Sequence, residues 1–358
     1  MASYSNTLTI VDSDLEAYFT SKFVNFLKDY TLTNKNVSIG VCQLNSATQL
    51  KKSITGYDAL LLEMGHHPID RAQIGAVRSS CPIVYIHNDF SLYNREVRDH
   101  VYFPWYFAQA CLDSIDQASF YTKSHPGFRQ NKKTYLFSCL NRNPKTERCW
   151  LYTKLHQTKF FDQTFTSFYN SFTWGDPINL EEVQKYLGGQ EMQYFEKEIL
   201  PYLPVGLESD LKINAEVSGF FSRDINHPAF SDAYVNIISE HLYEISFLSE
   251  KTVKPIAAEQ LFLMAGPVNS IKHIEDLGFD VFRDFIDHDY YDSEPDTKTR
   301  VNRMLDAAQD LYRQNPEDIY NITETRRRQN RLHLFSNQFG NSIVAPIGNW
   351  IDRELNTY

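Results

Sequence analysis

The chain has 358 residues, of which 42% are hydrophobic and 14% aromatic, and its formal net charge is −10. This length and apolar content suffice for two ordinary domains and exclude a disordered chain. The acidic balance opposes a protein that coats a nucleic-acid backbone, because such binding relies on a basic surface. It favours a glycan or small-molecule partner instead.

The cysteines and the N-terminal residues both bear on the cellular compartment of the protein. The five cysteines are scattered without CxxC spacing at positions 42, 81, 111, 139 and 149. This pattern predicts free buried thiols in a reducing compartment and no zinc site. Asp12, Asp14 and Glu16 stand where a signal peptide needs basic and apolar residues, and no run reaches transmembrane length. We expect a cytoplasmic chain without a membrane partner.

Residues 1–130 are expected to form a first α/β domain. A helix is predicted at Leu15–Tyr30, and strands at Leu8–Val11, Val37–Leu44, Ala59–Leu62 and Ile83–Ile86. Glu63, His66 and His67 follow the third strand, and Asp89 follows the fourth. Because carboxyl ends of parallel strands share one edge, these groups are expected to face a cleft.

A second domain is expected from residue 131 to residue 330. Its first strand, Tyr135–Leu140, runs into the basic turn Asn141–Lys145 and then a helix. A strand, a basic turn and a helix suit an anion; the alternative is an interdomain hinge with solvated arginines. The further expected elements are a strand at Phe161–Tyr169, a helix at 180–203 split by two glycines, a helix at Ile271–Leu277, a strand at Asp280–Phe285, and helices at Val301–Leu311 and Glu324–Leu334. Residues 331–358 are expected to return to the first domain.

The stretch 236–266 carries most of the functional signal. A β-branched run at 235–238 ends in Glu240, and the apolar run Leu261–Ala265 is closed by Gly266 and Pro267. Between them, Ser246 or Ser249 can cap a helix with Glu250, Lys251 and Thr252 in its first turn, where unpaired N–H groups favour an anion. The pattern predicts a βαβ unit with Glu240 and residues 249–252 at the ligand-binding edge of its sheet.

This stretch resembles the donor-site signature of the α-1,3-fucosyltransferases and their bacterial and viral relatives. In that family a strand ending Phe-Glu-Asn-Ser precedes Asp-Tyr-Val-Thr-Glu-Lys. Glu240 and Glu250 have the same separation as the two family glutamates, and residues 247–251 match the second half in kind. The chain differs at His241, Leu242 and Ser246, so GDP- and UDP-linked donors both stay open.

The resemblance implies an α/β GT-B glycosyltransferase, with two Rossmann-like domains facing a cleft and the acceptor side in 1–130. It implies that Glu250 holds the ribose, that Lys251 holds the diphosphate, and that an arginine near 142 contacts phosphate. Arg142 is the first candidate and Arg148 the second, while Glu240 orients the sugar or Lys251. Inverting transfer without a metal is expected, with a nucleotide sugar as co-substrate and no other cofactor.

The acceptor proton requires a base, and the first domain offers Glu63, then Asp89. Each of these two residues could also be an ordinary loop residue without a catalytic role. Asp287-His288-Asp289 contains an Asp-x-Asp triplet, but three residues in an acidic loop are weak evidence for a metal.

Other functions stay open on the sequence alone. Arginines 326, 327, 328 and 331 could hold nucleic acid, as in phage-type glucosyltransferases that act on hydroxymethylated DNA bases, or form a solvated face with acidic partners. The chain could also bind nucleotide sugars without transfer, or 236–266 could be an ordinary structural βαβ unit.

Overall fold

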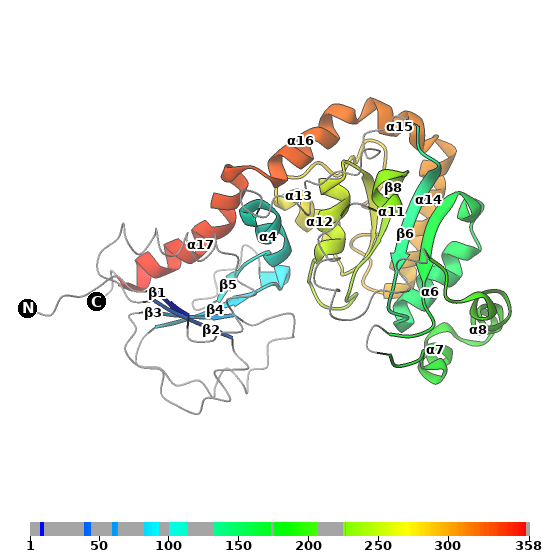
Figure 1. The fold of residues 1–358 in the computed structure, drawn as a ribbon, viewed down its shortest axis with the longest axis horizontal. Coiled ribbons are helices and arrows are strands. Elements are labelled where there is room, and N and C mark those ends of the chain that lie inside the picture. Colours follow the sequence, from blue (N-terminus) through cyan, green and yellow to red (C-terminus); the bar gives the residue numbers. More distant parts are fainter. Residues whose placement is uncertain are drawn as a thin grey trace, which may run out of the picture. The chain divides into compact units, whose positions relative to one another are not determined.

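The structure is a computed structural model that describes residues 8–10, 39–43, 59–63, 82–92, 100–113, 132–172, 175–206, 225 and 227–355. The chain divides into two compact units (Figure 1). Unit 1 comprises residues 1–117 and 335–358, and unit 2 comprises residues 118–334. The predicted helix at Leu15–Tyr30 and the residues His66 and His67 lie outside the described residues. The acceptor and donor roles of the two regions stay predictions.

Unit 1 contains a parallel five-stranded sheet in chain order. Its strands are β1 (Leu8–Ile10), β2 (Ile39–Gln43), β3 (Ala59–Glu63), β4 (Ile83–His87) and β5 (His100–Tyr102). The short turn η2 (Phe90–Leu92) follows β4, and α4 (Trp105–Asp113) follows β5. The last helix, α17 (Asn337–Leu355), packs on α4, with the rings of Phe107 and Phe339 6.2 Å apart.

Unit 2 contains a second parallel sheet whose order departs from the chain order. The strands are β6 (Tyr135–Asn141), β7 (Thr164–Phe168), β8 (Ala233–Ser239) and β9 (Leu261–Ala265), arranged β7-β6-β8-β9. Every residue of β8 and β9 is buried. β9 is wholly apolar and β8 is apolar apart from Asn236 and Ser239, which is typical of strands covered on both faces.

Helices cover both faces of this sheet. The helical elements described in unit 2 are α6 (Thr146–His156), η3 (Phe161–Gln163), α7 (Leu180–Leu187), α8 (Gly189–Tyr194), the π-helical η4 (Phe195–Ile199), η5 (Leu200–Tyr202), α11 (Pro228–Ser231), α12 (Glu250–Ala257), α13 (Ser270–Asp276), α14 (Thr297–Arg313), α15 (Pro316–Ile322) and α16 (Glu324–Leu334). Helix α14 packs on α6, and α16 packs on α12. Figure 1 shows α12 on one side of the sheet and α6 with α14 on the other. The chain therefore leaves β6 and β8 in opposite directions.

The predicted helix at 180–203 is interrupted, as its two glycines indicated. Gly188 ends α7 with φ 86°, a left-handed conformation that favours glycine. Gly189 then begins α8. The predicted strand at Phe161–Tyr169 is shorter than expected, because a 3₁₀ turn occupies its first residues and the strand begins at Thr164.

The predicted strand at Asp280–Phe285 is wrong, because residues 280–282 are irregular and residues 283–285 form a turn. The main chain of Asp280 is held by the side chain of Asn330 on α16: its N–H donates to Oδ1 at 2.8 Å and its carbonyl accepts from Nδ2 at 2.7 Å. Phe282 has φ 62°, which no strand residue adopts. Contacts with a distant helix thus override the local apolar pattern.

Candidate functional site

The carboxyl edge of the unit 2 sheet contains a point where the strand order reverses. From β6 the chain proceeds outward to β7, and from β8 it proceeds outward the other way to β9. Helices α6 and α12 begin just beyond these two central strands. In open α/β sheets, ligands bind in the crevice that forms at such a reversal, and helix N-termini there favour anions.

Helix α12 begins as the sequence predicted. Ser249 is its N-cap, and the Ser249 side chain accepts a hydrogen bond from the N–H of Lys251 at 3.2 Å. Glu250 is the first helical residue, and Pro255 lies inside the helix. The first turn therefore presents Glu250 and Lys251 at the carboxyl edge of β8, with Thr252 buried beneath them.

Glu240 ties the end of β8 to the start of this helix. One carboxylate oxygen accepts from the N–H of Ser249 at 3.0 Å and from the hydroxyl of Thr252 at 2.5 Å. The other accepts from the N–H of His241 at 3.0 Å. Glu240 is 0% exposed, so it has no open path to a sugar hydroxyl. Glu240 thus holds the start of the helix that carries Lys251, and its two predicted roles, orienting the sugar or Lys251, stay predictions.

Cations from separate elements converge on this edge. Lys145, at the end of the turn after β6, places Nζ 3.0 Å from the carbonyl oxygen and 3.4 Å from Nε2 of His241, which follows β8. Arg148 on α6 donates to the carbonyl of Glu240 at 2.9 Å. Lys251 is close enough for its charge to perturb both Lys145 and His241.

The pKa values of Lys145 and His241 reflect their burial and the positive charges around them. Lys145, Arg148 and Lys251 are called the cationic cluster below. Burial, followed by the charges of Arg148 and Lys251, lowers the pKa of Lys145 to about 8. Burial and the same neighbours, together with Lys145, lower the pKa of His241 to about 3. His241 is therefore neutral at pH 7, and a bound anion would relieve the repulsion among the cations.

Arg148 contributes a buried charge with incomplete hydrogen bonding. It is 2% exposed, and its described hydrogen bonds go to main-chain carbonyl oxygens of Asn143, Ser239 and Glu240. Its Nε is buried and lacks a partner among the described residues. Arg142, the first sequence candidate, is half-buried in the turn after β6.

Glu250 supplies an anionic acceptor beside the cations. Its carboxylate lies 2.5 Å from Nζ of Lys251. Burial alone would raise the pKa of Glu250, but the charges of Lys251 and Lys254 outweigh it and lower that pKa to about 2. The edge therefore combines cations for a phosphate with an ionised oxygen acceptor suited to hydroxyl groups.

The candidate bases belong to unit 1. Glu63 is the last residue of β3, where its main chain lies opposite Gln43 and Ile86 in the neighbouring strands. Asp89 follows β4 and accepts a hydrogen bond from the N–H of Ser91 at 2.9 Å. Glu63 thus ends one strand and Asp89 follows the neighbouring strand. The catalytic role of both residues stays a prediction.

Lys145 and His241 were not among the residues predicted for the site. The sequence placed Lys145 in a basic turn suited to an anion but favoured the nearby arginines. His241 was noted only as a difference from the family signature. Their mutual contact depends on β6 and β8 being neighbours, for which the sequence carries no local signal.

The arginines of α16 have partners inside the protein. Arg326 forms ion pairs with Asp280 at 2.5 Å and Asp284 at 2.7 Å. Arg327 is buried over the ring of Tyr320, with its guanidinium carbon 3.3 Å from the ring centre. Arg328 and Arg331 contact Glu324 at 2.7 Å and Glu259 at 3.9 Å, respectively. These contacts favour the structural interpretation of this helix over a nucleic-acid surface.

The side chains of the Asp-x-Asp triplet also have protein partners. Asp289 pairs with Arg283 at 2.6 Å, and His288 is buried with Nδ1 2.6 Å from the hydroxyl of Tyr291. Among the described residues, no group of three or more His, Cys, Asp or Glu side chains could hold a metal ion. Cys139 and Cys149 are buried free thiols.

Unit 2 is thus a doubly wound parallel α/β unit with Lys145, Arg148 and Lys251 gathered at the carboxyl edge of its sheet. No family model matches the chain, and no curated protein matches it. A solved structure described as the crystal structure of an α1,3-fucosyltransferase is similar over 98% of this chain and 92% of that chain, with 10% identity and a TM-score of 0.43. A likeness this distant assigns no function. In the part of the chain that the structure describes, no helix is both long and apolar enough to cross a membrane.

Proposed function

We propose that the chain is a glycosyltransferase that uses a nucleoside-diphosphate sugar and transfers the sugar to a hydroxyl acceptor. The observation that carries the proposal is the convergence of Lys145, Arg148 and Lys251 with the start of α12 at the reversal point of the unit 2 sheet. Departure of a nucleoside diphosphate requires neutralisation of its developing charge. The cationic cluster supplies this neutralisation from protein side chains.

Each residue of the edge has a role in this proposal. Lys251 and Lys145 contact the diphosphate, and the dipole of α12 adds partial positive charge at the first turn of the helix. Glu250 exchanges its ion pair with Lys251 for hydrogen bonds to the ribose hydroxyls. Arg148 is buried and bonded to main-chain carbonyl oxygens, so its side chain stays in place. Its charge raises the electrostatic potential at the phosphate site without direct contact.

Transfer proceeds with inversion and without a metal in this proposal. The acceptor hydroxyl attacks the anomeric carbon, the bond from that carbon to the diphosphate breaks, and a carboxylate takes the acceptor proton. Glu63 is the first candidate for that carboxylate and Asp89 the second. The acceptor is a glycan or another small hydroxyl compound.

The first experiment measures nucleotide binding. Thermal unfolding of the wild type is followed with GDP, UDP, CDP and ADP, since a ligand at a hundred times its Kd stabilises the fold by about 2.7 kcal/mol. One diphosphate is expected to stabilise the wild type, with the effect reduced in Lys251→Ala. Lys159→Ala is the matched control, because Lys159 is an exposed lysine between α6 and β7, at the opposite edge of the sheet.

The outcomes separate the functions that the sequence left open. No stabilisation by any nucleotide would overturn the donor site. Selective binding without hydrolysis or transfer of the matching nucleotide sugar would identify a binding protein without activity. Turnover that is lost in Glu63→Ala or Asp89→Ala, with donor affinity retained, would identify the base.

A further inference from the structure

A polar pocket lies in unit 2 away from the cationic cluster. It has a volume of about 370 Å³ and is lined by Lys154, Gln157, Gln190, Glu191, Gln193, Tyr194, Lys197 and Glu198. Arg148 belongs to the first turn of α6 and Gln157 follows the last, so the pocket lies roughly 14 Å further along that helix. Since α6 runs from the carboxyl to the amino edge of the sheet, the pocket is separate from the proposed donor site.

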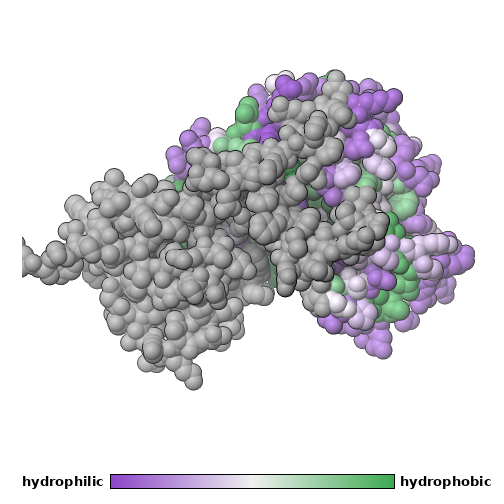
Figure 2. All heavy atoms as spheres, viewed as in Figure 1, coloured by the Kyte–Doolittle hydropathy of each residue, from purple (hydrophilic) through white to green (hydrophobic). Residues whose placement is uncertain are grey.

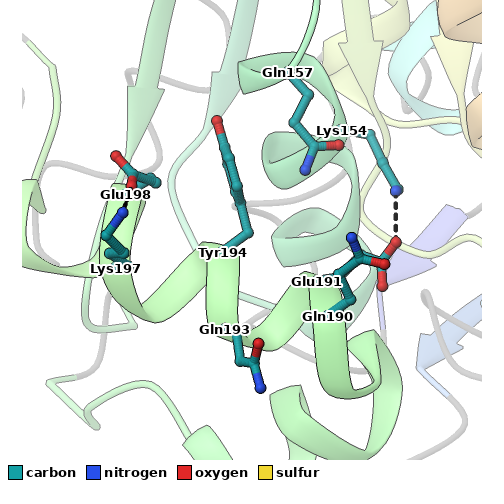
Figure 3. A pocket seen from close by; sticks show the side chains of 8 residues that line it. All are labelled: Lys154, Gln157, Gln190, Glu191, Gln193, Tyr194, Lys197 and Glu198. Carbon is teal, nitrogen blue, oxygen red and sulfur yellow. Dashed lines mark hydrogen bonds and ion pairs between the residues drawn. The ribbon is translucent and has the colours of Figure 1, made fainter.

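The charged side chains of the pocket neutralise one another. Lys154 pairs with Glu191 at 2.8 Å, and Lys197 pairs with Glu198 at 2.8 Å. Figure 3 shows the first pair on one side of Tyr194 and the second on the other. The lining therefore carries balanced charge and gives neither a phosphate nor a cation an electrostatic advantage.

The remaining polar groups are amides. Gln157, Gln190 and Gln193 are exposed, and their side chains have no hydrogen-bond partner among the described residues, so each offers both donors and an acceptor to a ligand that displaces water. Gln157 extends from α6 toward Tyr194, which extends from α8 (Figure 3). The area of α7 and α8 is largely hydrophilic in Figure 2. Such amides match a neutral ligand whose groups both donate and accept, as hydroxyls do.

Tyr194 gives the pocket a fixed aromatic wall. Its hydroxyl lies 2.8 Å from Nδ1 of His156, which holds the ring in place. Burial lowers the pKa of His156, so this partner adds no charge near neutral pH. An aromatic face beside amide groups suits a ring that has hydroxyls on its edge and C–H groups on its face.

The backbone beside the pocket also departs from regular helix. Residues Phe195–Ile199 form a π-helical turn immediately before Leu200 and Pro201. Pro201 has no N–H group to donate a hydrogen bond to the preceding turn. The wider π-helical turn accommodates this missing hydrogen bond. Insertions of this kind occur often at functional sites, and this one bears Lys197 and Glu198.

The geometry points to a second ligand site here, which binds a neutral saccharide independently of the nucleotide. A volume of about 370 Å³ lies within the range of small-molecule sites. Bound at this distance from the cationic cluster, the saccharide is held as an anchor and not as the reacting group. In a glycosyltransferase it would be a remote part of a glycan acceptor or product.

The test is saturation-transfer NMR on the full chain with glucose, galactose, N-acetylglucosamine and lactose, without nucleotide. At least one sugar is expected to bind with a Kd on the order of millimolar, and Gln157→Ala combined with Gln190→Ala is expected to weaken it about tenfold. Gln184→Ala, which removes an exposed amide of α7 outside the pocket, is the matched control. Lys251→Ala should leave sugar binding unchanged.

Three results would overturn the inference. The first is no signal from any sugar, and the second is equal binding by the double variant in a protein with unchanged circular dichroism. The third is sugar binding that Lys251→Ala abolishes, which would assign the sugar to the cationic edge. Because nucleotide binding is measured separately, failure of this site leaves the proposed function intact, and the converse also holds.

Discussion

Lys145 is expected to oppose folding at neutral pH. Burial and the charges of Arg148 and Lys251 lower its pKa from 10.5 to about 8, which corresponds to about 3 kcal/mol against the charged form. Because the side chain is only partly buried, solvent screening reduces this to about 1.5 kcal/mol. Lys145→Met also loses the 3.0 Å hydrogen bond to the carbonyl of His241, at a cost of about 0.5 kcal/mol. The variant should be about 1 kcal/mol more stable than the wild type at pH 7.

The stability gained by Lys145→Met should decrease as the pH rises. The unfolded chain keeps its proton on Lys145 up to about pH 10.5, whereas the folded chain releases it near pH 8. The stability of the wild type therefore rises between these values relative to the variant, so the advantage of Lys145→Met is full below pH 8 and is lost by pH 10.5. Urea unfolding at pH 7 and pH 10 measures it, with Lys159→Met as the control.

The same variant should bind the selected nucleotide more weakly. Loss of one charged hydrogen bond to phosphate costs about 1.5 kcal/mol, or about tenfold in Kd, which calorimetric titration measures. A residue that lowers stability and raises affinity is typical of a binding site. A variant that loses stability at pH 7, or keeps its nucleotide affinity, would refute this reasoning.

Other side chains give separate predictions. Glu240→Ala leaves two buried donors, on Ser249 and Thr252, and the part-buried N–H of His241 without their acceptor. Urea unfolding should therefore show a loss of about 3 kcal/mol, and a loss below about 1 kcal/mol would contradict the role of Glu240 in holding the start of α12. Burial raises the pKa of Cys139 to about 12 and also raises that of Cys149, so mass spectrometry should find both thiols unlabelled by a thiol reagent at pH 8 until urea is added. Arg327→Ala should cost about 3 kcal/mol because the residue is buried, whereas the exposed Arg328→Ala should change unfolding by less than about 0.5 kcal/mol.

The βαβ unit at β8, α12 and β9 was predictable because its signals are local. β9 is a continuous apolar run, β8 is apolar apart from Asn236 and Ser239, and both strands are fully buried. Ser249 supplies the cap that fixes the first residue of α12. Gly188 likewise ends α7 through its own backbone freedom. In each case the deciding interaction lies within a few residues of the pattern that indicated it.

The wrong prediction at Asp280–Phe285 arises from an interaction with a residue far away in the sequence. Val281 and Phe282 are apolar and buried, as in a strand, but Asn330 takes both main-chain hydrogen-bonding groups of Asp280. Backbone groups that are already satisfied by a side chain cannot join a sheet. The partner lies in another helix, so no window around residue 280 contains the information.

The candidate site likewise contains residues that local sequence signals identify and residues that only the fold brings together. Ser249, Glu250 and Lys251 could be found because they share one helix start and one family spacing. Lys145 meets His241 only because β6 and β8 are neighbours. Had the strands kept their chain order, β7 would separate β6 from β8 by about 10 Å, and the charge of Lys145 would be too far away to lower the pKa of His241 as it does. The gathering of positive charge at this edge therefore depends on the order of the strands in the sheet. A prediction of nucleotide binding from sequence cannot find it, because the strand order becomes known only with the fold.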